Sequence, residues 1–424
     1  MTMSSYTPDE NGYLKVKTYR SGHFVFQIGL DFQQLEPFAA RVNDAHIRFT
    51  SLPFVSEISG ELEKQVMVSS IYGTNTIEGG ELSYEETEEI IQAQDGATLA
   101  DSERRITNLR NAYKLSEKTA KYIFQARKQQ LEQAGQLLIP GEGILHLAED
   151  MFKELHAHIT DGLQHRYNKP TLYRDNVKGH KTQVGHTEKG GVYQPPKCKD
   201  DIQMLMHALC DWANCDAVKN LPALYRASLI HYYFELIHPF WDGNGRTGRV
   251  AEATILRASG YEYAPHAMSH YYLDNIQAYF QLLNQCRKAA EKKQTAPNTD
   301  FVIFFLKGML STINRLHDRA NVLISDILMQ ARLEHLIVNQ AITVRQHTIL
   351  ATLIANKQIR HRDKLKIQPW YKALYQNLTE RTAVRDLKKL VDLQLIYIDI
   401  NNTIHIISSK PKIKLSEHPH ANIS

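Results

Sequence analysis

The sequence predicts a mainly helical protein with one short β-hairpin inside the helical part, followed by a small domain of three helices and a second hairpin. Apolar residues recur with a helical period in segments from about residue 57 to residue 334. Two stretches, 182–193 and 395–407, instead combine β-branched and aromatic residues with turn residues, which is typical of hairpins. With 424 residues the chain can hold two or three domains, each with its own core.

The N-terminal part is predicted to be irregular at first and then helical. Residues 1–30 are polar, and residues 32–54 carry scattered apolar positions punctuated by two prolines. A helical stripe runs from about residue 57 into the seventies, and a capping box at Ser83 opens the next helix. A polar loop is expected at 287–299. Further helices are expected at 101–129, 143–162, 200–213, 221–237, 250–256, 270–283 and 301–334.

The bulk composition is typical of a soluble intracellular protein. Apolar residues make up 43% of the chain, and the net charge of +4 is too small to argue for a nucleic-acid partner. No apolar stretch reaches membrane-spanning length, and residues 1–13 lack the apolar core of a signal peptide. We therefore expect no membrane association and a cytoplasmic location in a bacterial cytosol, with delivery into a host cell left open.

Cysteines and histidines give no metal-binding pattern. The four cysteines form no CxxC pair and are most simply free thiols in a reducing compartment. The 20 histidines include no HExxH motif. His156 and His158 would face different sides of a helix, so we interpret them as surface or packing residues.

The twelve residues 238–249, HPFWDGNGRTGR, carry most of the chemistry in the sequence. They separate the helix at 221–237 from a second helical pattern that ends at Gly260. Glycines let the backbone approach a ligand closely, and free N–H groups at the start of the second helix suit an anion. Two arginines three positions apart share one helix face. The stretch predicts a phosphate-binding loop with a carboxylate, Asp242, for Mg²⁺ and an imidazole, His238, for proton transfer.

Any one of these residues also fits a glycine-rich turn with solvated charges, but their order is specific. The stretch matches H-x-F-x-[DE]-G-N-G-R-x-x-R, the signature of the Fic family, at every specified position. The chain thus resembles a Fic-family protein adenylyltransferase over about residues 50–315. The resemblance implies an all-α Fic fold with a small β-hairpin flap.

The resemblance also implies a reaction, the transfer of AMP from ATP to a Ser, Thr or Tyr hydroxyl of a target protein. His238 would be the base, and Asp242 would hold Mg²⁺ (or Mn²⁺). Arg249 would align the γ-phosphate of ATP, and Tyr279 or Phe280 would line the adenine pocket. The phosphate cradle would be formed by Gly243, Asn244, Gly245 and Arg246.

The segment that ends the helix after residue 57 has two interpretations. Gly79 and Gly80 explain a helix stop by themselves. Thr74 and Glu78, however, match the inhibitory motif [ST]-x-x-x-E-[GN] of the same family. By resemblance, Glu78 would pair with Arg249 and hold the enzyme in a self-inhibited state. In some relatives this glutamate positions a water that removes AMP, so a bifunctional enzyme is a further expectation.

The hairpin at 182–193 precedes a helix and lies upstream of the signature. It could be a plain surface loop. Its position instead matches the family's flap, which holds the target by strand addition and reads little side-chain sequence. The residues assigned to target binding are Val184, Gly185, His186 and Val192.

The C-terminal part resembles a winged helix-turn-helix domain. Helices are predicted at 348–354, 370–375 and 379–390, and two strands at 395–400 and 403–407 are joined by Asn401-Asn402. The third helix would enter a major groove in a DNA-binding protein. Dimerisation or protein docking, with a merely solvated basic face, is the alternative. The residues assigned to DNA are Arg381, Arg385, Lys388 and Lys389.

These elements predict four parts: an N-terminal helical region with the inhibitory helix (1–135), the Fic catalytic core (136–335), the winged-helix-like domain (336–412) and a tail (413–424). The expected partners are a target protein with an acceptor hydroxyl, DNA through the winged helix, and a second copy in a homodimer. Two alternatives remain open: a Fic-fold enzyme that transfers another group, such as phosphate or phosphocholine, and a DNA-binding regulator with a secondary Fic activity.

Overall fold

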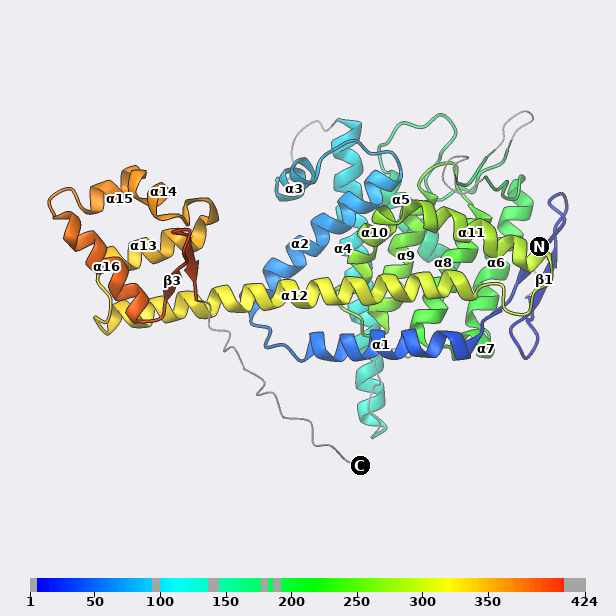
Figure 1. The fold of residues 1–424 in the computed structure, drawn as a ribbon. Coiled ribbons are helices and arrows are strands. Elements are labelled where there is room, and N and C mark those ends of the chain that lie inside the picture. The colour runs from blue at the N-terminus through cyan, green and yellow to red at the C-terminus, as the bar shows by residue number, and fades with distance from the viewer. Residues whose placement is uncertain (1–5, 94–99, 136–144, 177–181, 186–191, 408–424) are drawn as a thin grey trace, which may run out of the picture. The chain divides into compact units, whose positions relative to one another are not determined.

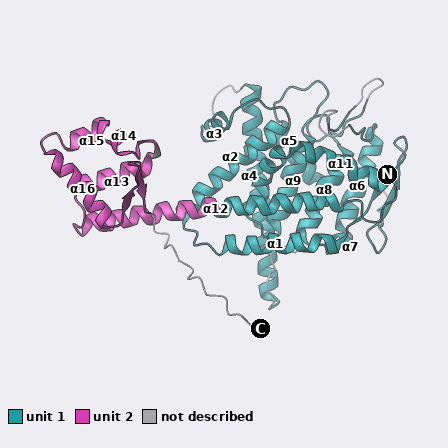
Figure 2. Ribbon diagram, in the orientation of Figure 1, with its two compact units in different colours: residues 1–317 teal, residues 318–424 magenta. Residues whose placement is uncertain are grey.

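The computed structural model describes residues 6–93, 100–135, 145–176, 182–185 and 192–407. They belong to two compact units, residues 1–317 and 318–424, and the division lies within helix α12 (Thr299–Val338) (Figures 1 and 2). The secondary structure is mostly helical, with two sheets of two strands each in the described residues, which confirms the predicted helical class. The four-part domain division stays a prediction.

The first unit begins with a hairpin that the sequence analysis missed. Strands β1 (Leu14–Lys17) and β2 (His23–Phe26) pair antiparallel, with Leu14 opposite Phe26. The prediction of irregular structure was wrong here. Strand β1 does alternate buried and exposed residues, but this period-2 pattern is only four residues long and was not recognised in the sequence. The turn is held by the Asp201 carboxylate, which accepts hydrogen bonds from the backbone N–H groups of Tyr19 (2.7 Å) and Ser21 (2.8 Å).

Helix α1 (Phe32–Thr50) covers the segment with scattered apolar residues. Asp31 caps it by accepting the N–H of Gln34, and Pro37 lies inside it without ending it. A proline in a helix removes a hydrogen bond, so the helix depends on burial of its apolar face. Tertiary packing thus overrides the local signal.

The core of the first unit is built on two consecutive helices, α8 (Ala223–Ile237) and α9 (Asn244–Ala258). Every residue of α8 is buried, and α9 contacts helices on several sides. The surrounding helices are α2 (Ser56–Ile77), α3 (Tyr84–Gln92), α4 (Asp101–Gln133), α5 (Glu149–Thr160), α6 (Lys199–Asn214), α7 (Asp216–Lys219), α10 (Ala264–Asp274) and α11 (Ile276–Glu291) (Figure 1). The loop between α8 and α9 therefore joins two buried helices of the core.

Three predicted helix boundaries were wrong. Helix α5 begins at Glu149 rather than near residue 143, since the backbone of Leu147 instead bonds to the amide side chain of Asn214. The aromatic helix predicted at 270–283 is two helices that meet at Asn275. Helix α11 continues to Glu291, so the expected polar loop is shorter than predicted.

The second unit contains the predicted C-terminal hairpin. Strands β3 (Ile396–Ile398) and β4 (Ile404–Ile406) pair antiparallel, which confirms that part of the prediction. A buried apolar cluster includes Leu353, Leu390 and Ile396. The helices of this unit are α13 (Val344–Ala355), α14 (Arg362–Ile367), α15 (Pro369–Leu374) and α16 (Glu380–Asp392), with a short 3₁₀ turn at Lys357–Ile359. The winged-helix assignment stays a prediction.

Within the described residues, no helix combines the length and the apolar character needed to cross a membrane.

Helices α2 and α10 approach each other closely, and Gly73 makes this possible. A Cβ atom at Gly73 would lie 2.8 Å from the carbonyl carbon of Ser269 and 2.9 Å from the backbone nitrogen of His270. Ser70 strengthens the contact by donating a hydrogen bond of 2.6 Å to the backbone carbonyl of His266. Because the opposing atoms are backbone, a side chain at position 73 would force the two helices apart.

We expect Gly73→Ala to lower the free energy of unfolding by about 1–3 kcal/mol, the usual cost of overpacking a tight contact. Gly60 on the same helix is the matched control, because a Cβ there meets nothing within 4 Å. Gly60→Ala should raise stability by about 0.5–1 kcal/mol through reduced chain entropy. Chemical denaturation of both variants measures the difference, and equal effects at the two positions would contradict this packing account.

Candidate functional site

The loop between α8 and α9 starts with a strained residue that is held from outside the signature. His238 caps α8 in the left-handed region, with φ of 50°. Its backbone carbonyl accepts a hydrogen bond of 2.7 Å from Nε of Arg174, and the carbonyl of Ile237 accepts one of 3.3 Å from Nη2. Arg174 is buried, and burial lowers its pKa to about 10. The sequence analysis missed Arg174, which has no motif around it.

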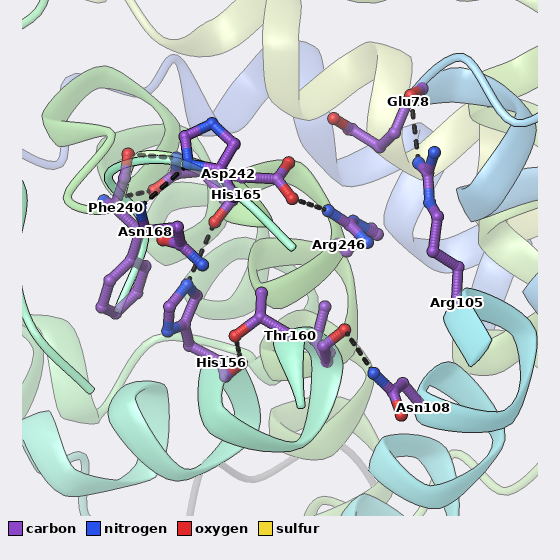
Figure 3. Close-up of polar contacts among 12 residues, drawn as sticks. Glu78, Arg105, Asn108, His156, Thr160, His165, Asn168, Phe240, Asp242 and Arg246 are labelled. Carbon is purple, nitrogen blue, oxygen red and sulfur yellow. Dashed lines mark hydrogen bonds and ion pairs between the residues drawn. The ribbon is translucent and has the colours of Figure 1, made fainter. Parts of the chain in front are cut away.

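Two further contacts fix the middle of the loop. The ring of buried Phe240 stacks on His156 of α5 with centroids 3.7 Å apart, as expected of a loop anchor. The side chain of Asn244 accepts from the N–H of Phe240 and donates to its carbonyl, each at 2.8 Å. His156 also contacts the carbonyl of Asp242 at 3.0 Å (Figure 3). Burial lowers the pKa of His156 to about 4, so its ring is a neutral packing group.

The next residues form a charged pair at the start of α9. The Asp242 carboxylate accepts a hydrogen bond of 2.7 Å from Nη2 of Arg246 (Figure 3). Burial raises the pKa of Asp242, but the charge and hydrogen bond of Arg246 outweigh burial and leave this pKa below its ordinary value. Arg246 is buried, and its Nε and Nη1 atoms have no hydrogen-bond partner among the described residues. A buried cation with unused donors beside a helix N-terminus suits an anion.

Arg249, one turn further along α9, is paired with helix α2. Its Nη2 atom donates to the Glu78 carboxylate at 2.7 Å, and its Nε atom donates to the Thr74 hydroxyl. Burial lowers the pKa of Arg249, but the negative charge of Glu78 outweighs it and raises this pKa above its ordinary value. The structure thus brings the predicted residues Thr74, Glu78 and Arg249 together.

Two more residues shape the surroundings of Glu78: Arg105, which lies outside any motif, and Gly245 of the signature. Arg105 of α4 donates a hydrogen bond of 3.1 Å from Nη2 to the backbone carbonyl of Glu78 (Figure 3). Burial lowers the pKa of Arg105, and the nearby positive charge of Arg246 lowers it further. A Cβ atom at Gly245 would lie only 2.1 Å from Oε1 of Glu78. The missing side chain at Gly245 therefore leaves the space that the Glu78 carboxylate occupies.

Behind the loop lies a buried polar network. Nδ1 of His231 lies 2.9 Å from the Glu252 carboxylate, which also accepts a 2.8 Å hydrogen bond from the Tyr272 hydroxyl. The Tyr279 hydroxyl lies 2.8 Å from Nε2 of His231. Tyr279, predicted to line the adenine pocket, is buried in this network, and its role toward a nucleotide stays a prediction.

A second buried carboxylate in this region, Glu235, faces the predicted base. Its Oε2 atom lies 3.7 Å from Nδ1 of His238. Burial raises the pKa of Glu235, but the interaction with His238, the nearby His231 and the Arg249 charge outweigh burial and lower it. The sequence analysis missed Glu235, although it lies three residues before His238 on the last turn of α8.

The predicted flap is described only in part. Val184 and Tyr193 form an antiparallel bridge in which each N–H donates to the other residue's carbonyl at 2.9 Å. Gly185 has a positive φ of 89°, as a chain reversal requires. Val192 precedes the bridge residue, and His186 lies outside the described residues.

The residues present fit a cation that is held jointly with phosphate oxygens. In the described part of the chain, no three His, Cys, Asp or Glu side chains gather into a metal cage. Mg²⁺ commonly uses one or two carboxylates together with substrate phosphates. Asp242, charged and 37% exposed at its side chain, is suited to that role.

The basic residues assigned to DNA are all on α16 of the second unit and are all exposed. They are Arg381, Arg385, Lys388 and Lys389.

Comparisons with known proteins agree with the loop and the fold. A family model described as "Fic/DOC family" matches residues 146–256. Proteins named "Protein adenylyltransferase Fic" from Drosophila willistoni and Drosophila erecta are 33% and 32% identical to the chain over 99 residues. These matches cover 21% of this chain and only 20% of each relative, about a fifth of its length.

Two solved structures share the fold. A Fic family protein from Desulfovibrio desulfuricans G20 is 17% identical, with a TM-score of 0.50, over 88% of this chain and 95% of that chain. A Fic domain containing signaling protein from Bacteroides thetaiotaomicron is 20% identical, with a TM-score of 0.51, over 66% and 97%. With the signature loop held between two buried helices, these matches show that the chain has a Fic fold and that residues 146–256 are similar to the Fic/DOC family.

Proposed function

We propose that this protein is an adenylyltransferase that moves AMP from ATP to a hydroxyl of a target protein and that Glu78 holds it inactive at rest. The observation that carries the proposal is the buried Arg249, which has the Glu78 carboxylate where a phosphate would bind. The distant similarity to protein adenylyltransferases supports the same chemistry.

His238 serves as the general base. It would take the proton from the target hydroxyl as that oxygen attacks the α-phosphorus of ATP, and pyrophosphate would leave. A positioned base typically contributes about 10²–10⁴-fold in rate. The contacts of Arg174 with the carbonyls of Ile237 and His238 keep the base at a fixed place on the loop.

The start of α9 provides the phosphate site. Arg246 has unused buried donors for α- and β-phosphate oxygens, and the backbone of Gly243, Asn244 and Gly245 can approach a phosphate closely. Asp242 would hold Mg²⁺, which neutralises charge on the departing pyrophosphate. The intact loop with Asp242 favours adenylyl transfer over the transfer of phosphate or phosphocholine.

Self-inhibition follows from competition for the same donors. Arg249 offers a planar guanidinium fork that binds either a carboxylate or a phosphate in the same geometry. While Glu78 occupies the fork, the γ-phosphate has no partner there, and the triphosphate is not aligned for attack. Movement of Glu78 out of the site would release Arg249 for the nucleotide.

The substrate is proposed to be an extended protein segment. The bridge between Val184 and Tyr193 marks a strand-like edge upstream of the signature. Strand addition along such an edge uses backbone hydrogen bonds, so it holds a segment while reading few of its side chains.

We expect Glu78→Gly to raise self-labelling from α-labelled ATP and Mg²⁺ by about tenfold or more, since loss of an inhibitory contact worth about 1.4 kcal/mol gives that factor. Glu78→Gly/His238→Ala should show no labelling, because the base is missing. The measurement is protein-bound label after electrophoresis, with chelator added as a metal control.

Label from γ-labelled ATP is the chemical control and should stay absent from the protein. Transfer of γ-label, or equal α-labelling in the single and double variants, would contradict the proposed adenylyl transfer.

The same site is proposed to remove AMP, with Glu78 positioning a water. Protein labelled by the Glu78→Gly variant should lose AMP when wild-type enzyme is added, whereas a Glu78→Gln enzyme should leave it in place. Release of labelled AMP over time measures this reaction. Equal release by both enzymes would rule out a role for Glu78.

DNA contact through α16 is a second proposed function, supported by the four exposed basic residues on one helix. We expect DNA binding that weakens with salt and survives His238→Ala. Charge reversal of Arg381 and Arg385 together should remove it, as a gel-shift titration at several salt concentrations would measure. Unchanged binding in that double variant would exclude α16 as the contact.

A further inference from the structure

The Nδ1 atom of the His238 imidazole faces a residue that lies outside the signature. Nδ1 of His238 is buried and has no hydrogen-bond partner in the described part of the chain. The Glu235 carboxylate approaches it to 3.7 Å, one helical turn earlier in the sequence. For Nε2 to act as a base, the proton of the neutral ring must be on Nδ1.

Glu235 is itself enclosed and incompletely bonded. Its side chain is 5% exposed, and Oε1 has no hydrogen-bond partner among the described residues. A buried carboxylate of this kind is costly unless a donor or a positive charge faces it. The titratable and charged groups that face Glu235 from the elements around it are His231 and His238 on or directly after α8, Arg249 on α9 and Tyr279 on α11.

The neighbouring helix leaves space for this carboxylate. A Cβ atom at Gly248 would lie 2.6 Å from Oε1 of Glu235 and 3.1 Å from Cδ1 of Phe234. Because Gly248 is a free position of the signature, the signature does not account for a glycine there. The space beside it lets the Glu235 side chain reach toward His238.

We infer that Glu235 is a positioning residue for His238: its carboxylate accepts the Nδ1 proton, which presents Nε2 to the target hydroxyl, and its charge stabilises the imidazolium formed on proton transfer. The separation of 3.7 Å is longer than a hydrogen bond. Such contacts are often long without substrate and shorten in the reacting complex. The catalytic effect of Glu235 rests on the proposed adenylyl transfer, whereas its effect on the tautomer of His238 does not.

The first test measures the tautomer directly. In full-length protein labelled with ¹⁵N-histidine, long-range ¹H–¹⁵N spectra should show neutral His238 protonated at Nδ1, with the signal assigned by its loss in His238→Ala. Glu235→Ala should shift the ring toward protonation at Nε2. Gly248→Ala should do the same with the carboxylate retained, because the added methyl group displaces it. Protonation at Nε2 in the wild type would overturn the inference.

The second test uses pH dependence in the Glu78→Gly background. Glu235→Gln should lower kcat by about 10- to 100-fold, as loss of a group that orients a histidine typically does. It should also move the acid limb of the rate profile to lower pH, since the imidazolium loses its negative neighbour. Glu235→Asp should restore part of the rate.

Glu252→Gln is the matched control. Glu252 is another buried carboxylate of the same network, but it contacts His231 and Tyr272 rather than His238. Its variant should leave the acid limb in place, whatever its effect on stability, which thermal unfolding of all variants monitors. An acid limb that Glu235→Gln does not move would overturn the inference. Absence of label transfer in every variant would instead count against the proposed function, while the tautomer result would stand independently.

Discussion

A buried guanidinium, that of Arg249, is the group on which the arrangement around the loop depends. A charge enclosed among α2, α8 and α9 needs an anionic partner, because an unpaired buried charge is strongly destabilising. Glu78 and Thr74 provide that partner from the end of α2. The space at Gly245 serves this contact, since it leaves room for the Glu78 carboxylate beside α9, while the close approach at Gly73 packs α2 against α10. In the proposed function, a nucleotide phosphate would satisfy the same requirement in place of Glu78.

The loop itself is rigid because groups outside its signature hold its backbone. Arg174 binds the carbonyls at the end of α8, His156 stacks on Phe240, and Asn244 closes the turn. None of these three side chains is free to bind a ligand through the atoms used in these contacts. Their effect is to fix where His238, Asp242 and Arg246 lie, so that little reorganisation is needed when a substrate arrives.

Two buried carboxylates lie behind the loop, and they differ in what they contact. Glu252 is bonded within the His231 and Tyr272 network and stabilises the packing of α8, α9 and α10. In each residue Oε1 has no hydrogen-bond partner among the described residues, but Oε2 of Glu235 faces His238 at the end of α8. The two carboxylates therefore differ in the contacts of Oε2: that of Glu252 has close contacts with His231 and Tyr272, whereas that of Glu235 has only the longer contact with His238.

The sequence by itself determined the helical class, because apolar residues recur with a helical period, and the loop with its charged residues, because a long motif with few free positions specifies residue types at fixed spacing. The pairing of Glu78 with Arg249 was expected from the family resemblance, and the contact of Thr74 with Arg249 was seen only in the structure. It did not reveal the β1–β2 hairpin or helix α1, where the local signals are short or contain a proline that burial overrides. Arg105, Arg174 and Glu235 were found only in the tertiary structure, and so were the contacts of His156, which the sequence indicated only as a surface or packing residue. Arg105, Arg174 and His156 contact residues that are distant in the sequence, and Glu235 faces His238 because of the turn at the end of α8. Neither kind of contact produces a recognisable pattern in the sequence.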